Sequence, residues 1–441
     1  MRSSLVLLVS SLLLSSGFGD TLPNIYPDTP WTPLVKEGSL EGWKELGGLA
    51  RYDLKDGVIV GKAVPNTPNS CLTTEKHYGD FVLEYEFLVD ERLNSGVQIR
   101  SNSFEDYKNG RVHGYQVEID PDMERARLWT AGIFEESLRG WLYDLKDNDA
   151  AREAFKPKTW NHIRVVAEGP RIRTWLNSVP AADLIDSVTM SGFIGLQIHG
   201  IGKNLERAGA EVAWRHLRIK DLGTRTWKPL FTGEDLSGWK ALPGGEWAVE
   251  DGVIRGTSPA SEKRHGMLLS EASYDDFTVR LKFKVDKGDS GFYWRAQPVD
   301  SVVSVNGFQV EVDSSFETGG LYETGGRAWV VKPDPNYIEK QAKYQPGQWT
   351  DLAMVVEGTN TRVFLNGRET ARLTSDEKGN REGHFGLQLH GSMDMDVSFK
   401  DLKILTKSKC TRNPAAVAVV GIRGLPRKSP PRRLRVATEA S

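Results

Sequence analysis

Gly114-Tyr-Gln-Val-Glu-Ile-Asp120 returns almost unchanged later in the chain as Gly307-Phe-Gln-Val-Glu-Val-Asp313. The strict alternation of polar and apolar residues predicts that each stretch is a β-strand buried on one face. The polar faces carry the same acceptors, namely Gln116, Glu118 and Asp120 in the first copy and Gln309, Glu311 and Asp313 in the second. Any polar residues would satisfy a solvated face, so this repetition indicates a more definite role.

The rest of the chain is duplicated around these two strands. Trp31-Thr-Pro-Leu34 returns as Trp227-Lys-Pro-Leu230, and Gly195-Leu-Gln-Ile-His-Gly200 returns as Gly386-Leu-Gln-Leu-His-Gly391. The repeat period is too long for a solenoid and matches a single domain of ordinary size. We therefore predict an extended leader over residues 20–30 and two tandem domains, residues 31–222 and 227–406.

Each copy is rich in short alternating runs separated by Asn, Asp and Gly, as in the turn sequence Leu365-Asn-Gly-Arg368. Only residues 145–154 and 338–344 have a weakly helical pattern. Many evenly spaced strands with almost no helix are typical of antiparallel sandwiches and barrels. The predicted fold class is therefore all-β, with two tandem sandwiches of the jelly-roll type.

The charge of the chain is divided unevenly. The net charge of the 441 residues is −2, yet residues 407–441 hold nine Lys and Arg against the single acid Glu439. The predicted folded part is therefore acidic, which argues against nucleic acid as a partner. The basic, Pro-rich tail is predicted to be disordered. With only Cys71 and Cys410, the chain has no disulfide framework.

The N-terminus is typical of a secretory signal peptide. Arg2 precedes the apolar run from Leu5 to Leu14, which is too short to span a membrane, and the small residues Gly17 and Gly19 follow at cleavage spacing. We predict a signal peptide over residues 1–19 and export to the periplasm or the extracellular space, with no transmembrane segment.

On three predicted strands of each copy, polar residues occupy every second position and therefore share one face of the strand. If they belong to one sheet, their side chains line one groove, which would suit a hydroxyl-rich ligand. The predicted groove residues are Gln98, Arg100, Gln116, Glu118, Asp120, Gln197 and His199 in the first copy, and Tyr293, Arg295, Gln309, Glu311, Asp313, Gln388 and His390 in the second.

Each of these residues also has a simpler interpretation. Arg100 and Glu118 could form an ordinary cross-strand ion pair worth less than about 1 kcal/mol. His199 could bond a loop carbonyl at the end of its strand. Trp129, Trp141 and Trp329 could anchor the core or loops, or they could stack on sugar rings.

Other chemistries find little support in the sequence. It contains no zinc-ligand spacing, no GxxxxGK[ST] loop, no HExxH and no GxSxG elbow. A set of His, Asp and Glu could hold a divalent metal, but no ligand spacing indicates one. No other cofactor is predicted, and no protein partner is indicated.

Taken together, these motifs resemble the 3-keto-disaccharide hydrolase domain family. The resemblance rests on Asn94-Ser-Gly96 with Arg100, on Gly114–Asp120, on Trp160-Asn161 with Leu176-Asn177, and on Gly195–Gly200. It covers both copies and implies concanavalin A-like sandwiches, export of the protein beyond the cytoplasm, and action on 3-keto-glucosides by hydrolysis or by elimination and hydration. A ketone at C3 acidifies the C2 proton, so such a site needs a base, an acid and a cation near the enolate.

The candidate catalytic residues are Glu118, Asp120, His199 and Arg100, with Glu311, Asp313, His390 and Arg295 in the second copy. The candidate substrate-binding residues are Gln98, Gln116, Gln197, Trp129, Arg139, Trp141, Gln309, Gln388, Tyr322 and Arg327. Two alternatives stay open: a two-carboxylate glycosidase and a non-catalytic tandem lectin-like module that binds glycan with raised avidity. The copies differ where Asn94 becomes Asp289 and Gln98 becomes Tyr293, so their substrates could differ.

Overall fold

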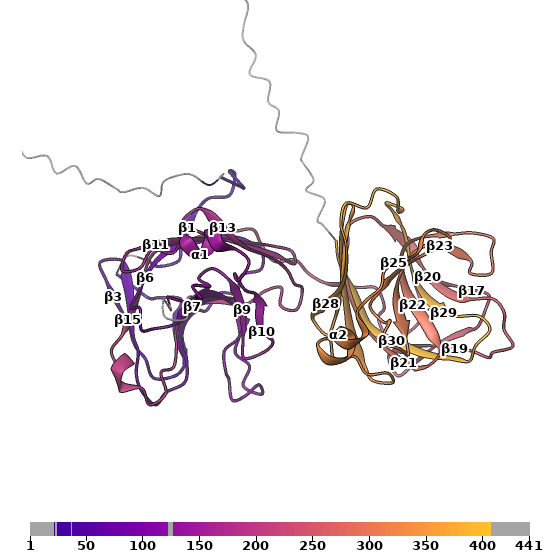
Figure 1. Ribbon diagram of the computed structural model, residues 1–441, viewed down its shortest axis with the longest axis horizontal. Helices are drawn as coiled ribbons and strands as arrows, with labels where there is room; N and C mark the ends of the chain where they lie inside the picture. The colour runs from indigo at the N-terminus through magenta and orange to yellow at the C-terminus, as the bar shows by residue number, and fades with distance from the viewer. Residues whose placement is uncertain (1–21, 23, 37, 122–126, 407–441) are drawn as a thin grey trace, which may run out of the picture. The chain divides into compact units, whose positions relative to one another are not determined.

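The computed structural model describes residues 22–406 except 23, 37 and 122–126, and it contains two β-sandwiches built almost entirely of antiparallel strands (Figure 1). Its colours run from indigo to magenta through the first sandwich and from orange to yellow through the second. The predicted signal peptide, residues 1–19, and the predicted tail, residues 407–441, lie outside the described residues. The all-β prediction is confirmed.

The first sandwich consists of two facing sheets, and strands far apart in the sequence are neighbours in each. One sheet has the order β13 (Val179–Ile185), β12 (Arg171–Leu176), β11 (Asn161–Glu168), β6 (Phe81–Val89), β15 (Glu211–Asp221), β4 (Val58–Lys62) and β3 (Tyr52–Lys55), with β1 (Thr32–Pro33) beside β15. The other has the order β10 (Gly140–Tyr143), β9 (Ile133–Glu136), β8 (His113–Ile119), β7 (Ser95–Asn102), β14 (Phe193–Ile198), β5 (Ser70–Thr74) and β2 (Trp43–Gly47).

The second sandwich repeats this arrangement. One sheet has the order β18 (Glu246–Glu250), β19 (Val253–Ser258), β30 (Met395–Thr406), β21 (Phe277–Lys287), β26 (Thr350–Glu357), β27 (Asn360–Leu365) and β28 (Arg368–Leu373), with β16 (Lys228–Pro229) beside β30. The other has the order β17 (Trp239–Leu242), β20 (Gly266–Tyr274), β29 (Gly383–Leu389), β22 (Asp289–Pro298), β23 (Val305–Asp313), β24 (Leu321–Thr324) and β25 (Ala328–Val331).

Helices are short in the described chain: α1 (Asp149–Glu153), α2 (Pro335–Lys340) and the 3₁₀ turn η1 (Leu205–Arg207). Helix α1 lies inside the predicted stretch, whereas α2 starts three residues before its predicted start. Asp334 caps this helix by accepting from the Asn336 amide at 3.0 Å, and Pro335 takes the first helical position, where its missing N–H costs nothing.

The core of the first sandwich is built by the apolar faces of the predicted strands. On β8, Tyr115, Val117 and Ile119 are fully buried between the sheets. Their alternation with Gln116 and Glu118 sends these two polar side chains to the opposite face. The predicted alternation of this strand is confirmed, and the same strand supplies both the core and the polar face described below.

The polar strands β7 and β8 pack closely because Gly96 lies between their side chains. Gly96 pairs with Glu118 across the strands, and a methyl group at its Cα would come within 2.5 Å of Cγ of Gln116. Gly291 stands in the same relation to Gln309 in the second copy. The repeated Ser-Gly pair is therefore explained by side-chain space and not by backbone conformation.

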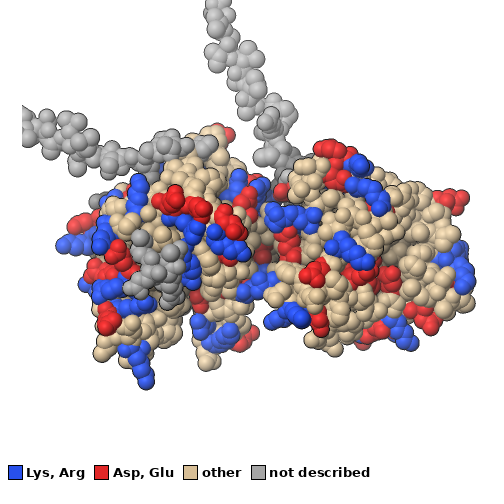
Figure 2. All heavy atoms as spheres, viewed as in Figure 1, with Lys and Arg blue, Asp and Glu red and all other residues tan. Residues whose placement is uncertain are grey.

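Basic and acidic side chains are interspersed over the face of the molecule seen in Figure 2, and neither sign forms a broad patch there. None of the helices in the described ranges has the length and apolar character that crossing a membrane would require.

Candidate functional site

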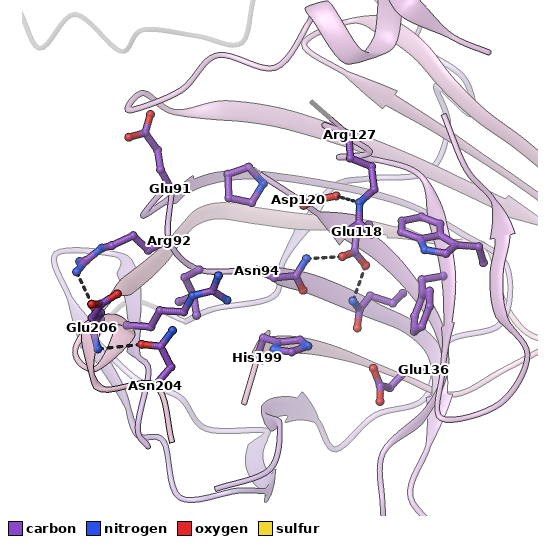
Figure 3. Close-up of a pocket in the computed structure, with 16 residues that line it drawn as sticks. Glu91, Arg92, Asn94, Glu118, Asp120, Arg127, Glu136, His199, Asn204 and Glu206 are labelled. Atoms are coloured by element: carbon purple, nitrogen blue, oxygen red, sulfur yellow. Dashed lines mark hydrogen bonds and ion pairs between the residues drawn. The ribbon is translucent and has the colours of Figure 1, made fainter. Parts of the chain in front are cut away.

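A cavity of about 720 Å³ opens on the polar face of β8 in the first sandwich (Figure 3). Gln116, Glu118 and Asp120 line it from the centre, and Phe134 and Trp141 line it from β9 and β10. His199, directly after β14, lines it from the opposite direction. This volume lies in the range of small-molecule sites. The sheet thus gathers the polar row of β8, an aromatic wall and a histidine around one space.

Glu118 is a buried acid in the wall of this cavity, and its pKa is raised. Its side chain is 4% exposed, and it accepts from Nδ2 of Asn94 at 2.6 Å and from Nε2 of Gln116 at 2.7 Å. Burial raises the pKa of Glu118 to about 7, although these two donors act in the opposite direction. A carboxyl group with this pKa exchanges protons readily near neutral pH, as a general base or acid must.

Asp120 is paired with a cation at the same wall. Nε of Arg127 donates to Oδ2 of Asp120 at 2.6 Å, and the Asp120 amide donates to Oγ1 of Thr130 at 3.0 Å. The Arg127 guanidinium also lies 5.1 Å and 5.6 Å from the ring centres of Trp129 and Trp141. Arg127 therefore brings a positive charge to the cavity between a carboxylate and an aromatic wall.

A chain of side-chain amides supports Glu118 from behind. Nε2 of Gln98 and Nε2 of Gln197 donate to Oε1 of Gln116, at 2.5 Å and 2.6 Å, and Gln116 donates onward to Glu118. Gln98 and Gln197 are fully buried and do not line the cavity. They fix the orientation of Gln116 by donating to it. The prediction that Gln98 and Gln197 contact the substrate directly is therefore wrong.

His199 lines the cavity from an exposed position. Its Nδ1 lies 2.9 Å from the carbonyl of Gly200, so Nδ1–H donates to that oxygen. This is the strand-end bond considered above, and it leaves Nε2 as the polar atom that a ligand could use.

The expectation that Arg100 shares this surface is wrong. A bulge interrupts the pairing of β7 with β8 between Ile99 and Asn102, and Arg100 has a φ of 46°. Its fully buried guanidinium donates to the carbonyls of Gly79 and Gly169, both at 2.7 Å, and to Asp80 at 3.1 Å. Arg100 therefore holds loops together and has no ion pair with Glu118.

The equivalent arginine in the second copy and the predicted Arg139 are also structural. Arg295 has a φ of 50° and donates to the carbonyls of Asp275, Gly358 and Asn380. Arg139 is held by Glu135 at 2.5 Å and by Asp186 at 2.8 Å, and it does not line the cavity. Trp129 does not line the cavity either. It packs edge-on against Trp141, which does, with ring centres 4.7 Å apart.

The second copy places the corresponding residues in different surroundings. Gln309 donates to Glu311 at 2.6 Å, and burial, followed by the charge of Asp289, raises the pKa of Glu311 to about 9. Asp313 accepts from both Ser315 and Thr318, with no arginine bonded to it in the described chain.

Tyr293 changes the side chains that lie behind the polar residues of the second copy. Its hydroxyl lies 2.8 Å from Oγ1 of Thr324 and accepts from Gln388 at 3.1 Å, and Tyr293 stands at the position that Gln98 of the amide chain has in the first copy. His390 packs against His265 with ring centres 4.2 Å apart. Two further predicted residues have other partners: Tyr322 packs edge-on against Trp329, and Arg327 pairs with Glu323 and Asp376.

Several cavity residues were not among the predicted site residues. Asn94 directly precedes the repeated Ser-Gly pair, so its position at the strand end was a usable signal. Arg127 lies outside the alternating run of β8, and Glu136 reaches the cavity through the pairing of β9 with β8, so a single sequence offers no rule that brings them together. No group of three or more His, Cys, Asp or Glu suited to a metal ion is found among residues 22–406 outside the gaps named above.

The chain belongs to the 3-keto-alpha-glucoside-1,2-lyase-like domain family, whose model matches residues 30–220 and residues 226–405. The resemblance noted from the sequence is thereby confirmed in both copies. A carbohydrate-related function follows from this membership.

Each of the following solved structures matches about two fifths of this chain. A Parabacteroides distasonis protein with a provisional glycosyl hydrolase assignment is 22% identical over 41% of this chain and 93% of its own, with a TM-score of 0.31. The Bacillus subtilis carbohydrate-binding module CBM66 is 19% identical over 40% and 99%, with a TM-score of 0.31. A B. subtilis protein of unknown function with a galectin-like fold is 12% identical over 41% and 94%, also at 0.31. A search of curated proteins found no match.

Proposed function

We propose that the protein is an exported enzyme that cleaves 3-keto-glucosides, and that its active site is the cavity of the first sandwich. The observation that supports this most directly is Glu118, a buried carboxyl group with a pKa of about 7 at the wall of a sugar-sized cavity. The family description concerns lyase chemistry on 3-keto-glucosides. This chemistry begins with removal of a weakly acidic C–H proton, which requires such a base.

In the proposed reaction, ionised Glu118 takes the proton from C2 of the keto sugar. The electron pair of the C2–H bond moves toward the C3 ketone and forms an enolate, which the Arg127 guanidinium stabilises. The enolate then expels the oxygen substituent at C1, with formation of a C1–C2 double bond. A water molecule held at Nε2 of His199 gives a proton to the departing oxygen.

Water completes the cycle by adding to the unsaturated product. The hydroxide left by the water at His199 bonds to C1, and Glu118, whose proton has by then exchanged with solvent, gives a proton to C2. The net result is hydrolysis to 3-keto-glucose and a free alcohol. Phe134 and Trp141 offer an aromatic wall to the C–H face of the keto sugar. Arg127 takes the role of the cation that the sequence had suggested for Arg100.

The test compares matched substitutions in the two copies. The full chain, Glu118→Gln and Glu311→Gln are each supplied with a 3-keto-glucoside in D₂O, and the released sugars are analysed by mass spectrometry. We expect release by the wild-type protein with deuterium at C2, a loss of about 10²- to 10⁴-fold in Glu118→Gln, and near wild-type release in Glu311→Gln.

The other outcomes are informative. Full activity in Glu118→Gln would exclude the proposed base. Release without deuterium at C2 would favour the two-carboxylate glycosidase. Binding of the sugar without any release would make the protein a tandem carbohydrate-binding module.

A further inference from the structure

The loop that follows the histidine of the site differs between the two copies. In the first copy, residues 201–210 separate Gly200 from β15, whereas in the second copy only residues 392–394 separate Gly391 from β30. The turn before β7 is also longer, because residues 90–94 precede it in the first copy and only residue 288 separates β21 from β22 in the second. The first copy therefore has an additional wall that the second copy lacks.

This wall is tied together and faces the cavity. Nη1 of Arg92 donates to the carbonyl of Glu206 at 2.8 Å, and Arg92 is itself paired with Asp90 at 2.5 Å. Asn204 and Arg207 line the cavity together with Arg92 and Glu206. Figure 3 shows Arg92, Asn204 and Glu206 at one end of the cavity, Asn94 and His199 in the middle, and Glu118 with Arg127 at the other end.

The two ends offer different chemistry. The aromatic rings that line the cavity, Phe134 and Trp141, belong to β9 and β10, next to Glu118. At the loop end, Glu206 and Arg207 line the cavity, and neither side chain has a hydrogen bond or ion pair with another described residue. Unengaged carboxylate and guanidinium groups can bond several hydroxyl groups of a ligand. An aryl ring can stack on the guanidinium, but it has no donor for the carboxylate and would cover that group without replacing its hydrogen bonds to water.

We infer that the loop 201–210, held by Arg92, forms the subsite for the leaving group and favours a hydroxyl-rich leaving group, such as a second sugar, over an aryl one. This inference rests on the proposed function, because it takes the end at Glu118 as the place of the keto sugar. It assigns leaving-group selectivity to Glu206 and Arg207, and it confines that selectivity to the first copy.

The test measures the ratio of kcat/KM for a 3-keto-disaccharide to kcat/KM for a nitrophenyl 3-keto-glucoside in the full chain. The test variant carries Glu206→Ala and Arg207→Ala. The matched control is Lys203→Ala, which removes a cation from the same loop but does not line the cavity. We expect the ratio to fall about tenfold or more in the double variant, as the loss of charged hydrogen bonds implies, and to stay within about twofold in the control.

A second measurement requires no turnover. The same substitutions are combined with Glu118→Gln, and the proteins are titrated with the 3-keto-disaccharide and with 3-keto-glucose by calorimetry. We expect the Kd of the disaccharide to rise at least about fivefold while that of 3-keto-glucose changes less than about twofold.

If the wild-type protein cleaves neither substrate, the proposed function fails, and the titrations alone then decide the role of the loop. An unchanged kcat/KM ratio in an active enzyme would overturn the inference. Equal weakening for both sugars in the titrations, or no weakening of the disaccharide, would overturn it too.

Discussion

Asn94→Asp would give the first copy the pair of acids that the second copy already has. Asn94 donates to Glu118, whose pKa is about 7, whereas Asp289 occupies the equivalent place beside Glu311, whose pKa is about 9. The difference of about two pKa units between the copies corresponds to about 2.7 kcal/mol in favour of the neutral acid. The substitution replaces a hydrogen-bond donor with a second negative charge, so it should raise the pKa of Glu118 toward that of Glu311.

The consequence for the rate is large at neutral pH. If the pKa of Glu118 rises from about 7 to about 9, its ionised fraction at pH 7 falls from about one half to about 1%, and a step that needs the carboxylate slows about fiftyfold. The introduced aspartate would titrate as part of the same pair, as Asp289 does with a pKa raised to about 6, chiefly by burial. Activity should return above about pH 9, because the base itself is still present.

The assay is the dependence of kcat/KM on pH, from about pH 5 to about pH 10, for a 3-keto-glucoside. The wild-type profile should rise through about pH 7, and the Asn94→Asp profile should rise through about pH 9. Asn94→Ala is the control, since it removes the donor without adding charge, and its shift should be smaller. An Asn94→Asp profile that still rises near pH 7 would refute the reasoning.

Three further substitutions test other parts of the structure. Gly96→Ala places a methyl group 2.5 Å from Cγ of Gln116, so it should displace that amide and lower kcat/KM about tenfold or more; a wild-type rate would show that the amide is dispensable. Arg100→Met should cost about 1–3 kcal/mol in urea unfolding for each of the two buried carbonyls, of Gly79 and Gly169, that lose their donor, while Asp80 keeps Arg225 as a partner. The folded enzyme should keep its kcat, and lost activity at unchanged stability would show that Arg100 belongs to the site. Glu311 has a pKa raised from 4.5 to about 9, so its neutral form favours folding and the wild type should lose up to about 2.7 kcal/mol between pH 6 and pH 8. Glu311→Gln should flatten this pH dependence in urea unfolding, and an equally steep decline in the variant would argue against the raised pKa.

Much of the fold could be predicted because alternation and repetition are local signals. The strand Gly114–Asp120 shows this. One face of the strand supplies Tyr115, Val117 and Ile119 to the core, and the opposite face supplies Gln116 and Glu118 to the cavity. The duplicated phrases predicted both sandwiches for the same reason.

The site was harder to predict because a bulge breaks the rule of alternation. Counting residues from Gln98 places Arg100 on the polar face, but the positive φ at Arg100 turns its side chain elsewhere. The cation of the cavity is Arg127, whose hydrogen bond with Asp120 is not part of any alternating pattern. The loop 201–210 was missed for a related reason, because its contact with Arg92 joins positions more than a hundred residues apart.

The chain of amides behind Glu118 has a direction, since each NH₂ group donates toward the carboxylate and Ser101 donates to Gln98 at its far end. An ionised Glu118 accepts strongly from the two amide nitrogens beside it, whereas a neutral Glu118 is a weaker acceptor and carries a proton that neither nitrogen can accept. The charge of the carboxyl group is thus communicated to side chains that lie outside the cavity. In an NMR titration, the side-chain amide signals of Gln98 and Gln197 would act as an internal pH indicator for the active site.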